Sequence, residues 1–136
     1  MRIGVVDLDT SHPQSWIPIE RDLGHEVACV WDGGAVHPKE YVEKFAEEHQ
    51  IPEVCETLEE VVDKVDCAIL HGCDWDTHAE KARPFVEAKK GVLLDKPMAG
   101  SLSDLNQLKA WADAGARITG GSSLRFCVET REWFDI

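Results

Sequence analysis

The chain has 136 residues, of which 43% are hydrophobic and 29% are charged, and its formal net charge is −12. This is the composition of one ordinary globular domain. The sequence has no apolar run near the ~20 residues of a membrane span, and its acidic balance disfavours nucleic acid and anionic membranes, which bind clustered lysine and arginine.

The N-terminus and the cysteines bear on the cellular location. The apolar stretch at the N-terminus is too short for a signal peptide, and the acidic residue Asp7 follows it directly. The five cysteines are odd in number and form no C-x-x-C pair, which favours reduced thiols over a disulfide framework. We therefore expect a cytoplasmic protein whose partner is a small molecule. Homo-oligomerisation stays open.

Strands and helices are predicted to alternate along the whole chain. The strands are short apolar runs, which suit a parallel sheet buried on both faces. They cover residues 2–7, 26–31, 65–70, 91–95 and 117–119.

Helix signals stand between these runs. Three capping boxes are predicted to start helices, and Pro38 suits a first turn. The boxes are Thr57 with Glu60, Thr77 with Glu80, and Ser101 with Asp104, and Gly115 is predicted to end the last helix. Pro18 and Pro84 fall inside helical patterns, so kinks or late helix starts are expected there.

The alternation predicts an α/β fold with a doubly wound, mainly parallel sheet, a Rossmann-like three-layer sandwich over residues 1–136. Ligands of such sheets bind beyond the carboxyl ends of the strands. The residues that follow each strand are therefore the candidate site.

The loop after the first strand lacks the expected glycines. A dinucleotide fold normally places G-x-G-x-x-G there, because glycine lets the backbone approach the pyrophosphate. Aligned on the strand, the three glycine positions hold Asp7, Asp9 and His12, with Thr10 and Ser11 between them. The two carboxylates predict repulsion of phosphate unless a cation intervenes. The alternative is that Asp9 or Ser11 caps the first helix.

Asp32 follows the second strand and precedes two glycines. An acidic residue at this point commonly binds the ribose hydroxyls of NAD. It is equally compatible with an ordinary turn.

The segment after the third strand is rich in possible ligands. It begins with His71 and reaches His78 through Cys73 and Trp75. The spacing matches no standard zinc motif, so the main interpretation contains no metal site. In that interpretation Asp76 or Thr77 caps the next helix, while His71 and Trp75 line a cleft.

Asp95, Lys96 and Pro97 follow the fourth strand. A lysine at the carboxyl end of a buried strand can donate to a ribose hydroxyl or to a carbonyl. It can equally form an ion pair with Asp95 or Asp7.

These residues carry a family resemblance. The run from Val65 to Leu70, the helix that opens at Thr77-His78, and the segment from Gly91 to Ala99 resemble the N-terminal domain of the Gfo/Idh/MocA oxidoreductases. That family has a hallmark Glu-Lys-Pro at this strand end, and Asp95 stands here in place of the Glu. The resemblance extends over essentially the whole chain.

The resemblance implies a function and assigns residues to it. NAD or NADP would be the cofactor, a sugar-like alcohol or polyol the substrate, and Lys96 the catalytic residue beside the nicotinamide ribose. Asp32 would hold the adenosine ribose. His71, Asp95 and Pro97 would line the cofactor site together with residues 7 and 9–12. The altered loop predicts weak binding.

The resemblance also implies what this chain lacks. The family's C-terminal substrate domain is expected to be absent, so the isolated chain is expected not to turn over. Two alternatives remain from the residues alone. One is a non-catalytic Rossmann module for another ligand or a protein partner, and the other is a metal-assisted site built from Asp7, Asp9, His12, His71 and His78.

Overall fold

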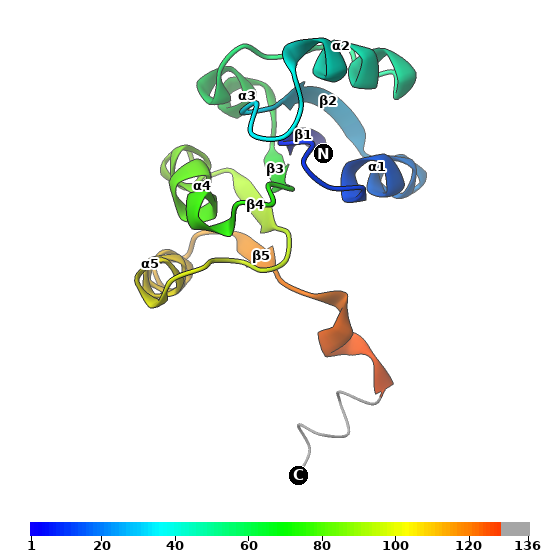
Figure 1. Ribbon diagram of the computed structural model, residues 1–136. Coiled ribbons are helices and arrows are strands. Elements are labelled where there is room, and N and C mark those ends of the chain that lie inside the picture. Colours follow the sequence, from blue (N-terminus) through cyan, green and yellow to red (C-terminus); the bar gives the residue numbers. More distant parts are fainter. Residues whose placement is uncertain (129–136) are drawn as a thin grey trace.

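A computed structural model describes residues 1–128 of the chain, which form a five-stranded parallel sheet flanked by helices (Figure 1). The strand order is β2-β1-β3-β4-β5, so the chain reverses direction across the sheet between β1 and β3. The strands are β1 Arg2–Val6, β2 Glu26–Trp31, β3 Cys67–Leu70, β4 Gly91–Leu94 and β5 Ile118–Gly120. The predicted doubly wound α/β fold is confirmed.

The helices cover the two faces of the sheet and enclose two apolar cores. One core joins the sheet to α1 (His12–Asp22) and α2 (Lys39–Glu48) through Ile17, Val42 and Phe45. The other joins it to α3 (Leu58–Lys64), α4 (His78–Glu87) and α5 (Leu102–Asp113). Short 3₁₀ turns, η1 (Trp75–Thr77) and η2 (Ser123–Phe126), precede α4 and follow β5. Among the described residues, no helix has the length and apolarity to span a bilayer.

At two of the three predicted capping boxes, the hydroxyl cap that starts the helix is confirmed. The hydroxyl of Thr57 accepts a hydrogen bond from the Glu60 amide, and that of Ser101 accepts one from the Asp104 amide. The third is wrong, because the Thr77 hydroxyl donates to the carbonyl of Asp74 instead. The Asp74 side chain accepts from the Asp76 amide and so starts the turn η1.

The prolines do not delay their helices. Pro18 lies inside α1, and Pro84 lies inside α4, which begins at His78. The expected late starts are therefore wrong at both places. The predicted end of α5 is confirmed, because Gly115 follows it with a φ of 94°, a conformation that glycine adopts without strain.

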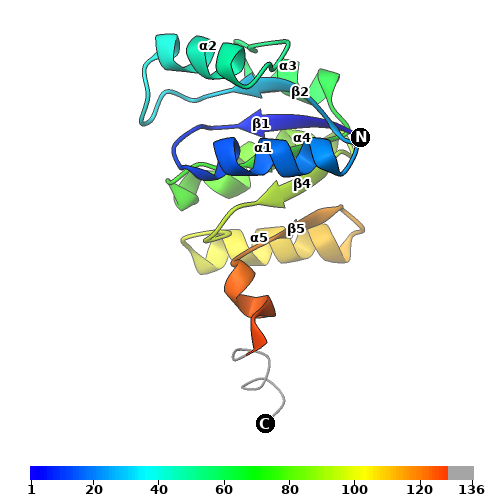
Figure 2. The same ribbon diagram turned by 90° about the vertical axis from the view of Figure 1, so that its right-hand side faces the viewer.

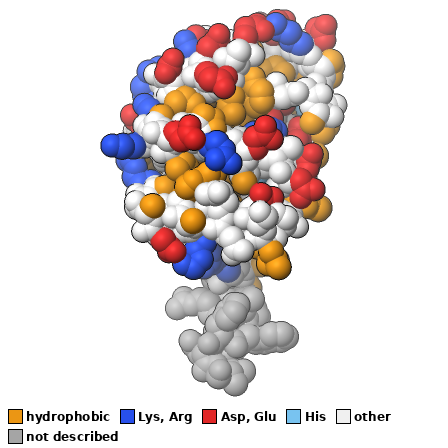
Figure 3. All heavy atoms as spheres, turned by 90° about the vertical axis from the view of Figure 1, so that its left-hand side faces the viewer, with side chains coloured by type: hydrophobic (Ala, Val, Ile, Leu, Met, Phe, Trp, Pro, Cys, Tyr) orange, Lys and Arg blue, Asp and Glu red, His pale blue; other side chains and the backbone are white. Residues whose placement is uncertain are grey.

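The face of the sheet that carries α1 is only partly covered. Beside the end of α1, a hollow of about 530 Å³ lies over β3, β4 and β5. Half-buried side chains such as Cys67, Leu93 and Ile118 line it. The opposite face is covered by α3, α4 and α5, whose surface intersperses acidic, basic and hydrophobic side chains (Figure 3).

The strands all run in one direction, so their carboxyl ends meet at one edge of the sheet (Figure 2). The loops that leave this edge, and the first residues of the helices that follow them, carry the candidate site residues. The fold therefore brings the candidate site together in one place.

Candidate functional site

Asp7, at the end of β1, is a buried carboxylate paired with a lysine. Its Oδ2 lies 2.6 Å from Nζ of Lys81 on α4, and its Oδ1 accepts a hydrogen bond from the Gly33 amide. The Asp7 residue is fully buried, and the Lys81 side chain is 15% exposed. The cation that could offset a carboxylate in this loop is therefore Lys81.

The backbone at Asp7 is in the left-handed region, with φ at 64°. Aspartate enters this region more readily than most residues, because its short side chain can bond locally. Burial raises the pKa of Asp7, although Lys81 and the Gly33 amide act in the opposite direction. The side chain is thus buried, with Lys81 and the Gly33 amide as its partners.

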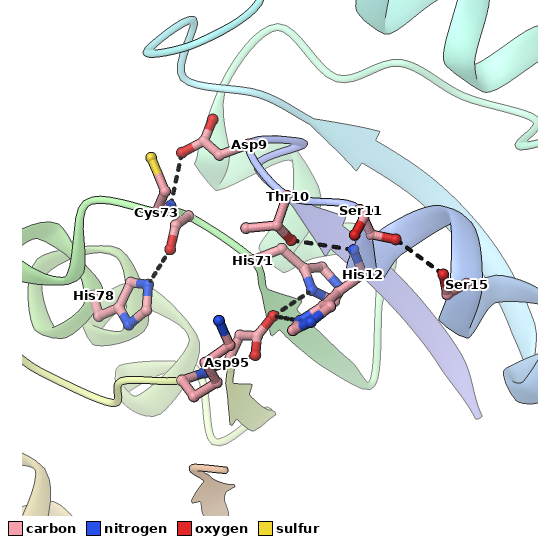
Figure 4. Close-up of polar contacts among 11 residues, drawn as sticks. Asp9, Thr10, Ser11, His12, Ser15, His71, Cys73, His78 and Asp95 are labelled. Atoms are coloured by element: carbon pink, nitrogen blue, oxygen red, sulfur yellow. Dashed lines mark hydrogen bonds and ion pairs between the residues drawn. The ribbon is translucent and has the colours of Figure 1, made fainter. Parts of the chain in front are cut away.

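Asp9 behaves differently from Asp7. Its Oδ2 accepts a hydrogen bond from the amide of Cys73, in the loop after β3 (Figure 4). Its Oδ1 is buried and has no partner among the described residues. The expectation that Asp9 or Ser11 caps the first helix is wrong, because the Thr10 hydroxyl accepts from the His12 amide and Ser11 makes no side-chain cap.

The loop leaves three amides free at the start of α1. The His12 and Leu8 amides bond to Thr10 and Asp32, but within residues 1–128 the amides of Asp9, Thr10 and Ser11 reach no acceptor. Free amides at a helix N-terminus, together with the helix dipole, form an anion-binding site. The loop therefore offers unpaired amide donors of the kind that an anion-binding site uses, in spite of its missing glycines.

Asp32, at the end of β2, ties two loops together. Its Oδ2 accepts from the Leu8 amide at 2.8 Å, and its Oδ1 accepts from the Gly34 amide at 2.6 Å. A cavity of about 160 Å³ lies beside it. Each carboxylate oxygen retains a further lone pair, so Asp32 can still accept hydrogen bonds from a ligand.

Asp95, after β4, faces two histidines, which both approach the same carboxylate oxygen (Figure 4). Nδ1 of His12 and Nδ1 of His71 both donate to its Oδ2, the second at 3.3 Å. Its Oδ1 accepts from the Lys96 amide. The ring of Trp16 stacks on His12 and meets His71 edge to face.

His12, His71 and Asp95 form a triad. The protonation states of Asp95 and His71 follow from burial and hydrogen bonding. Burial alone would raise the pKa of Asp95, but the hydrogen bonds from His71, His12 and the Lys96 amide outweigh it and hold that pKa well below its usual range. Burial lowers the pKa of His71 and outweighs the neighbouring carboxylate. Asp95 is therefore ionised at neutral pH, and His71 is neutral.

His71 is fully buried, so the expectation that it lines a cleft is wrong. Its Nε2 has no hydrogen-bond partner among the described residues. His12 is the accessible member of the triad, with a side chain 31% exposed. His12 is therefore the one of these three residues that a ligand most readily reaches from the surface.

Lys96 is exposed and lines a cleft of about 410 Å³ together with His12, Asp95 and the segment after β5. The peptide bond between Lys96 and Pro97 is cis. Within the described part of the chain, the Lys96 ammonium makes no ion pair, so the alternative of a pair with Asp95 or Asp7 is wrong. The lysine is left free to meet a ligand.

The five residues of the metal alternative do not gather in one place. Asp7 pairs with Lys81, Asp9 turns to Cys73, and His78 lies between the carbonyl oxygens of Gly72 and Met98. Two residues of the site, Lys81 and Trp16, were not predicted from the sequence. Trp16 could have been found from its spacing of four residues from His12 on one helix, whereas Lys81 had no local signal.

A parallel sheet with free helix-terminal amides, an acid after the second strand and a cleft at the carboxyl edge defines the chain as a Rossmann-type nucleotide-binding domain. Residues 1–119 match the family described as "Oxidoreductase family, NAD-binding Rossmann fold". The chain belongs to this family, Gfo/Idh/MocA, and supplies its NAD-binding domain. No curated protein matches the sequence significantly.

Solved structures share the fold at low sequence identity. A dehydrogenase (MviM) from Clostridium difficile superimposes with a TM-score of 0.80 at 22% identity, over 99% of this chain and 43% of its own length. The UDP-N-acetylglucosamine 3-dehydrogenase of Acidithiobacillus ferrooxidans gives 0.76 at 19%, over 99% and 41%. GenD2 from gentamicin A biosynthesis, solved in complex with NAD, gives 0.80 at 19%, over 99% and 38%. The chain thus spans less than half the length of these structures.

Proposed function

We propose that this chain binds NAD or NADP along the carboxyl edge of its sheet, as the cofactor domain of an oxidoreductase for a sugar-like or polyol substrate. The observation that carries the proposal is the set of three free amides of Asp9, Thr10 and Ser11 at the N-terminus of α1. They match the donors that a pyrophosphate requires.

The remaining contacts follow from the order of the strands. Asp32 would accept hydrogen bonds from the adenosine ribose, since it ends the strand next to β1. The nicotinamide end would lie on the other side of the loop, toward the cleft lined by His12, Asp95 and Lys96. Pro97 would border the same end.

The bound nicotinamide supplies hydride transfer. The contribution of this chain is to hold it, with Lys96 donating a hydrogen bond to the nicotinamide ribose and to the reacting oxygen of the substrate. Hydride transfer also needs a surface that excludes water and orients the substrate. We therefore expect the 136-residue chain to bind the cofactor without turnover.

Binding is expected to be weak because of Asp9. Its buried Oδ1 has no partner and stands in the loop that would meet the phosphates. Asp7 contributes little repulsion, because Lys81 offsets its charge.

The proposal can be tested by nuclear magnetic resonance of the labelled chain titrated with NAD and with NADP. We expect the amide signals of Asp9, Thr10, Ser11 and Gly33 to shift saturably. The amides of Asn106 and Gln107, on α5 away from this edge, serve as internal controls. Shifts confined to other regions, or none at millimolar cofactor, would contradict the proposal.

The unpartnered Oδ1 of Asp9 favours one second candidate. A non-catalytic module would use the same cleft for a neutral or cationic ligand, for which Asp9 is an acceptor rather than a source of repulsion. Replacing Asp9 by Asn separates the two functions, because it strengthens dinucleotide binding and weakens the binding of a cation.

A further inference from the structure

We propose that His12, His71 and Asp95 form a binding site for one divalent transition-metal ion of the zinc class. One donor atom from each residue lies within 4.8 Å of the other two. The three residues come from three different elements, namely the first turn of α1 and the ends of β3 and β4. The site requires no dinucleotide and stands independently of the proposed function.

The spacing of the donor atoms is close to that of a zinc site. Bonds of 2.0–2.2 Å in a tetrahedron place neighbouring donor atoms about 3.3–3.6 Å apart. The Nδ1 of His71 and the Oδ2 of Asp95 are already 3.3 Å apart. The Nδ1 of His12 lies closer to that oxygen, so its ring would withdraw slightly. The ring can do so because it is 31% exposed at the start of α1.

The donor set selects the class of ion. Two imidazole nitrogens and one carboxylate oxygen suit zinc, cobalt, nickel and iron, whereas magnesium and calcium prefer oxygen ligands alone. Zinc is the ion we use as the probe. The chain's net charge of −12 favours the approach of any cation.

The surroundings orient all three ligands. The Lys96 amide donates to Oδ1 of Asp95 and leaves Oδ2 facing the two histidines. Trp16 packs against both imidazole rings. Metal binding requires the His71 proton to move to Nε2, which has no hydrogen-bond partner among the described residues, so that Nδ1 is freed as a ligand.

Three protein ligands leave one position of a tetrahedron open. Two of the ligands, His12 and Asp95, line the cleft of about 410 Å³, so the open position lies beside that cleft. Lys96 lines the same cleft. An oxygen atom of a bound ligand, such as an alcohol or a carboxylate, could complete the coordination. Three protein ligands and one open position are typical of catalytic rather than structural zinc sites.

The test is metal binding by the purified chain after treatment with a chelator. Calorimetry with zinc is expected to show one ion per chain. Cobalt is expected to give the intense visible absorption of a tetrahedral complex, displaced by zinc. Nitrogen resonances of the His12 and His71 rings should shift at Nδ1 when zinc is added.

Two variants decide the assignment. His12→Gln changes a partly exposed residue and is expected to lower zinc affinity by at least roughly 100-fold, the upper end of what losing a mere outer-shell partner costs, without loss of the fold. Asp95→Asn keeps the shape and should do the same; if it does not fold, His12→Gln decides alone. Cys73→Ala and His37→Gln remove an exposed thiol and a loop imidazole, and both should bind like the parent chain.

The proposal fails if the parent chain binds no zinc, since the triad is then held by hydrogen bonds alone. It also fails if His12→Gln binds as tightly as the parent. Binding that disappears in Cys73→Ala or His37→Gln would place the ion elsewhere and would likewise overturn the assignment.

Discussion

The ammonium of Lys81 lies 2.6 Å from a carboxylate oxygen of Asp7, and the two side chains are 15% and 1% exposed. Lys81 also lies over the ring of Trp31, 5.8 Å from its centroid. The pair joins α4 to the end of β1, across 74 residues of sequence. Lys81 is thus the cation that offsets the buried charge of the Asp7 carboxylate.

Lys81→Met is expected to destabilise the fold by about 3–5 kcal/mol, because it leaves the Asp7 carboxylate buried without its cation. Asp7→Asn in the same chain should restore most of the loss, since asparagine is uncharged and tolerates the positive φ. Urea denaturation measures both. Lys89→Met, at an exposed site, is the control, and its free energy of unfolding should change little. If Lys81→Met and Lys81→Met/Asp7→Asn lose the same stability, the pairing is contradicted.

The stability of Lys81→Met is expected to rise as the pH falls from neutral. The pKa of Asp7 is already raised above its usual 3.8 by burial, and the substitution removes the lysine that opposes this shift. A carboxyl with a raised folded-state pKa binds its proton more readily in the folded chain, so acidification favours folding between the raised pKa and about 4. The comparison is with Lys81→Met/Asp7→Asn, which lacks the group and should show no such rise.

Asp9→Asn is expected to strengthen dinucleotide binding at least tenfold, about 1.4 kcal/mol. It removes the carboxylate that faces the phosphates, and the amide oxygen can still accept from Cys73. Calorimetry with NAD measures the gain, and Asp63→Asn on the exposed side of α3 controls for net charge. An equal gain in Asp63→Asn would show that only general repulsion is involved.

Lys96→Met is expected to keep its melting temperature within a few degrees and to lose dinucleotide affinity by roughly 1.5–3 kcal/mol, the contribution of a charged hydrogen bond. The stability should hold because Lys96 is exposed and makes no ion pair within the described residues. Lys109→Met on α5 is the control. If Lys96→Met binds NAD as well as the parent, Lys96 is not a binding residue.

Much of the fold could be predicted because its signals are local. The apolar runs gave strands close to their observed bounds, and the caps at Thr57 and Ser101 depend on residues only three positions apart. The prediction at Thr77 failed because Asp74, also nearby, offered a competing carboxylate and carbonyl. Local competition of this kind cannot be ranked from residue types alone.

The sequence by itself determined which residues stand at the carboxyl ends of the strands, since the alternation of apolar runs and helices sets that order. The tertiary structure alone decided their partners. It turned Asp7 inward to Lys81, left Lys96 unpaired and brought His12 to Asp95 across 83 residues of sequence. The physical reason is that a buried charge takes whichever partner the packing of distant elements brings within reach, and no local pattern encodes that distance.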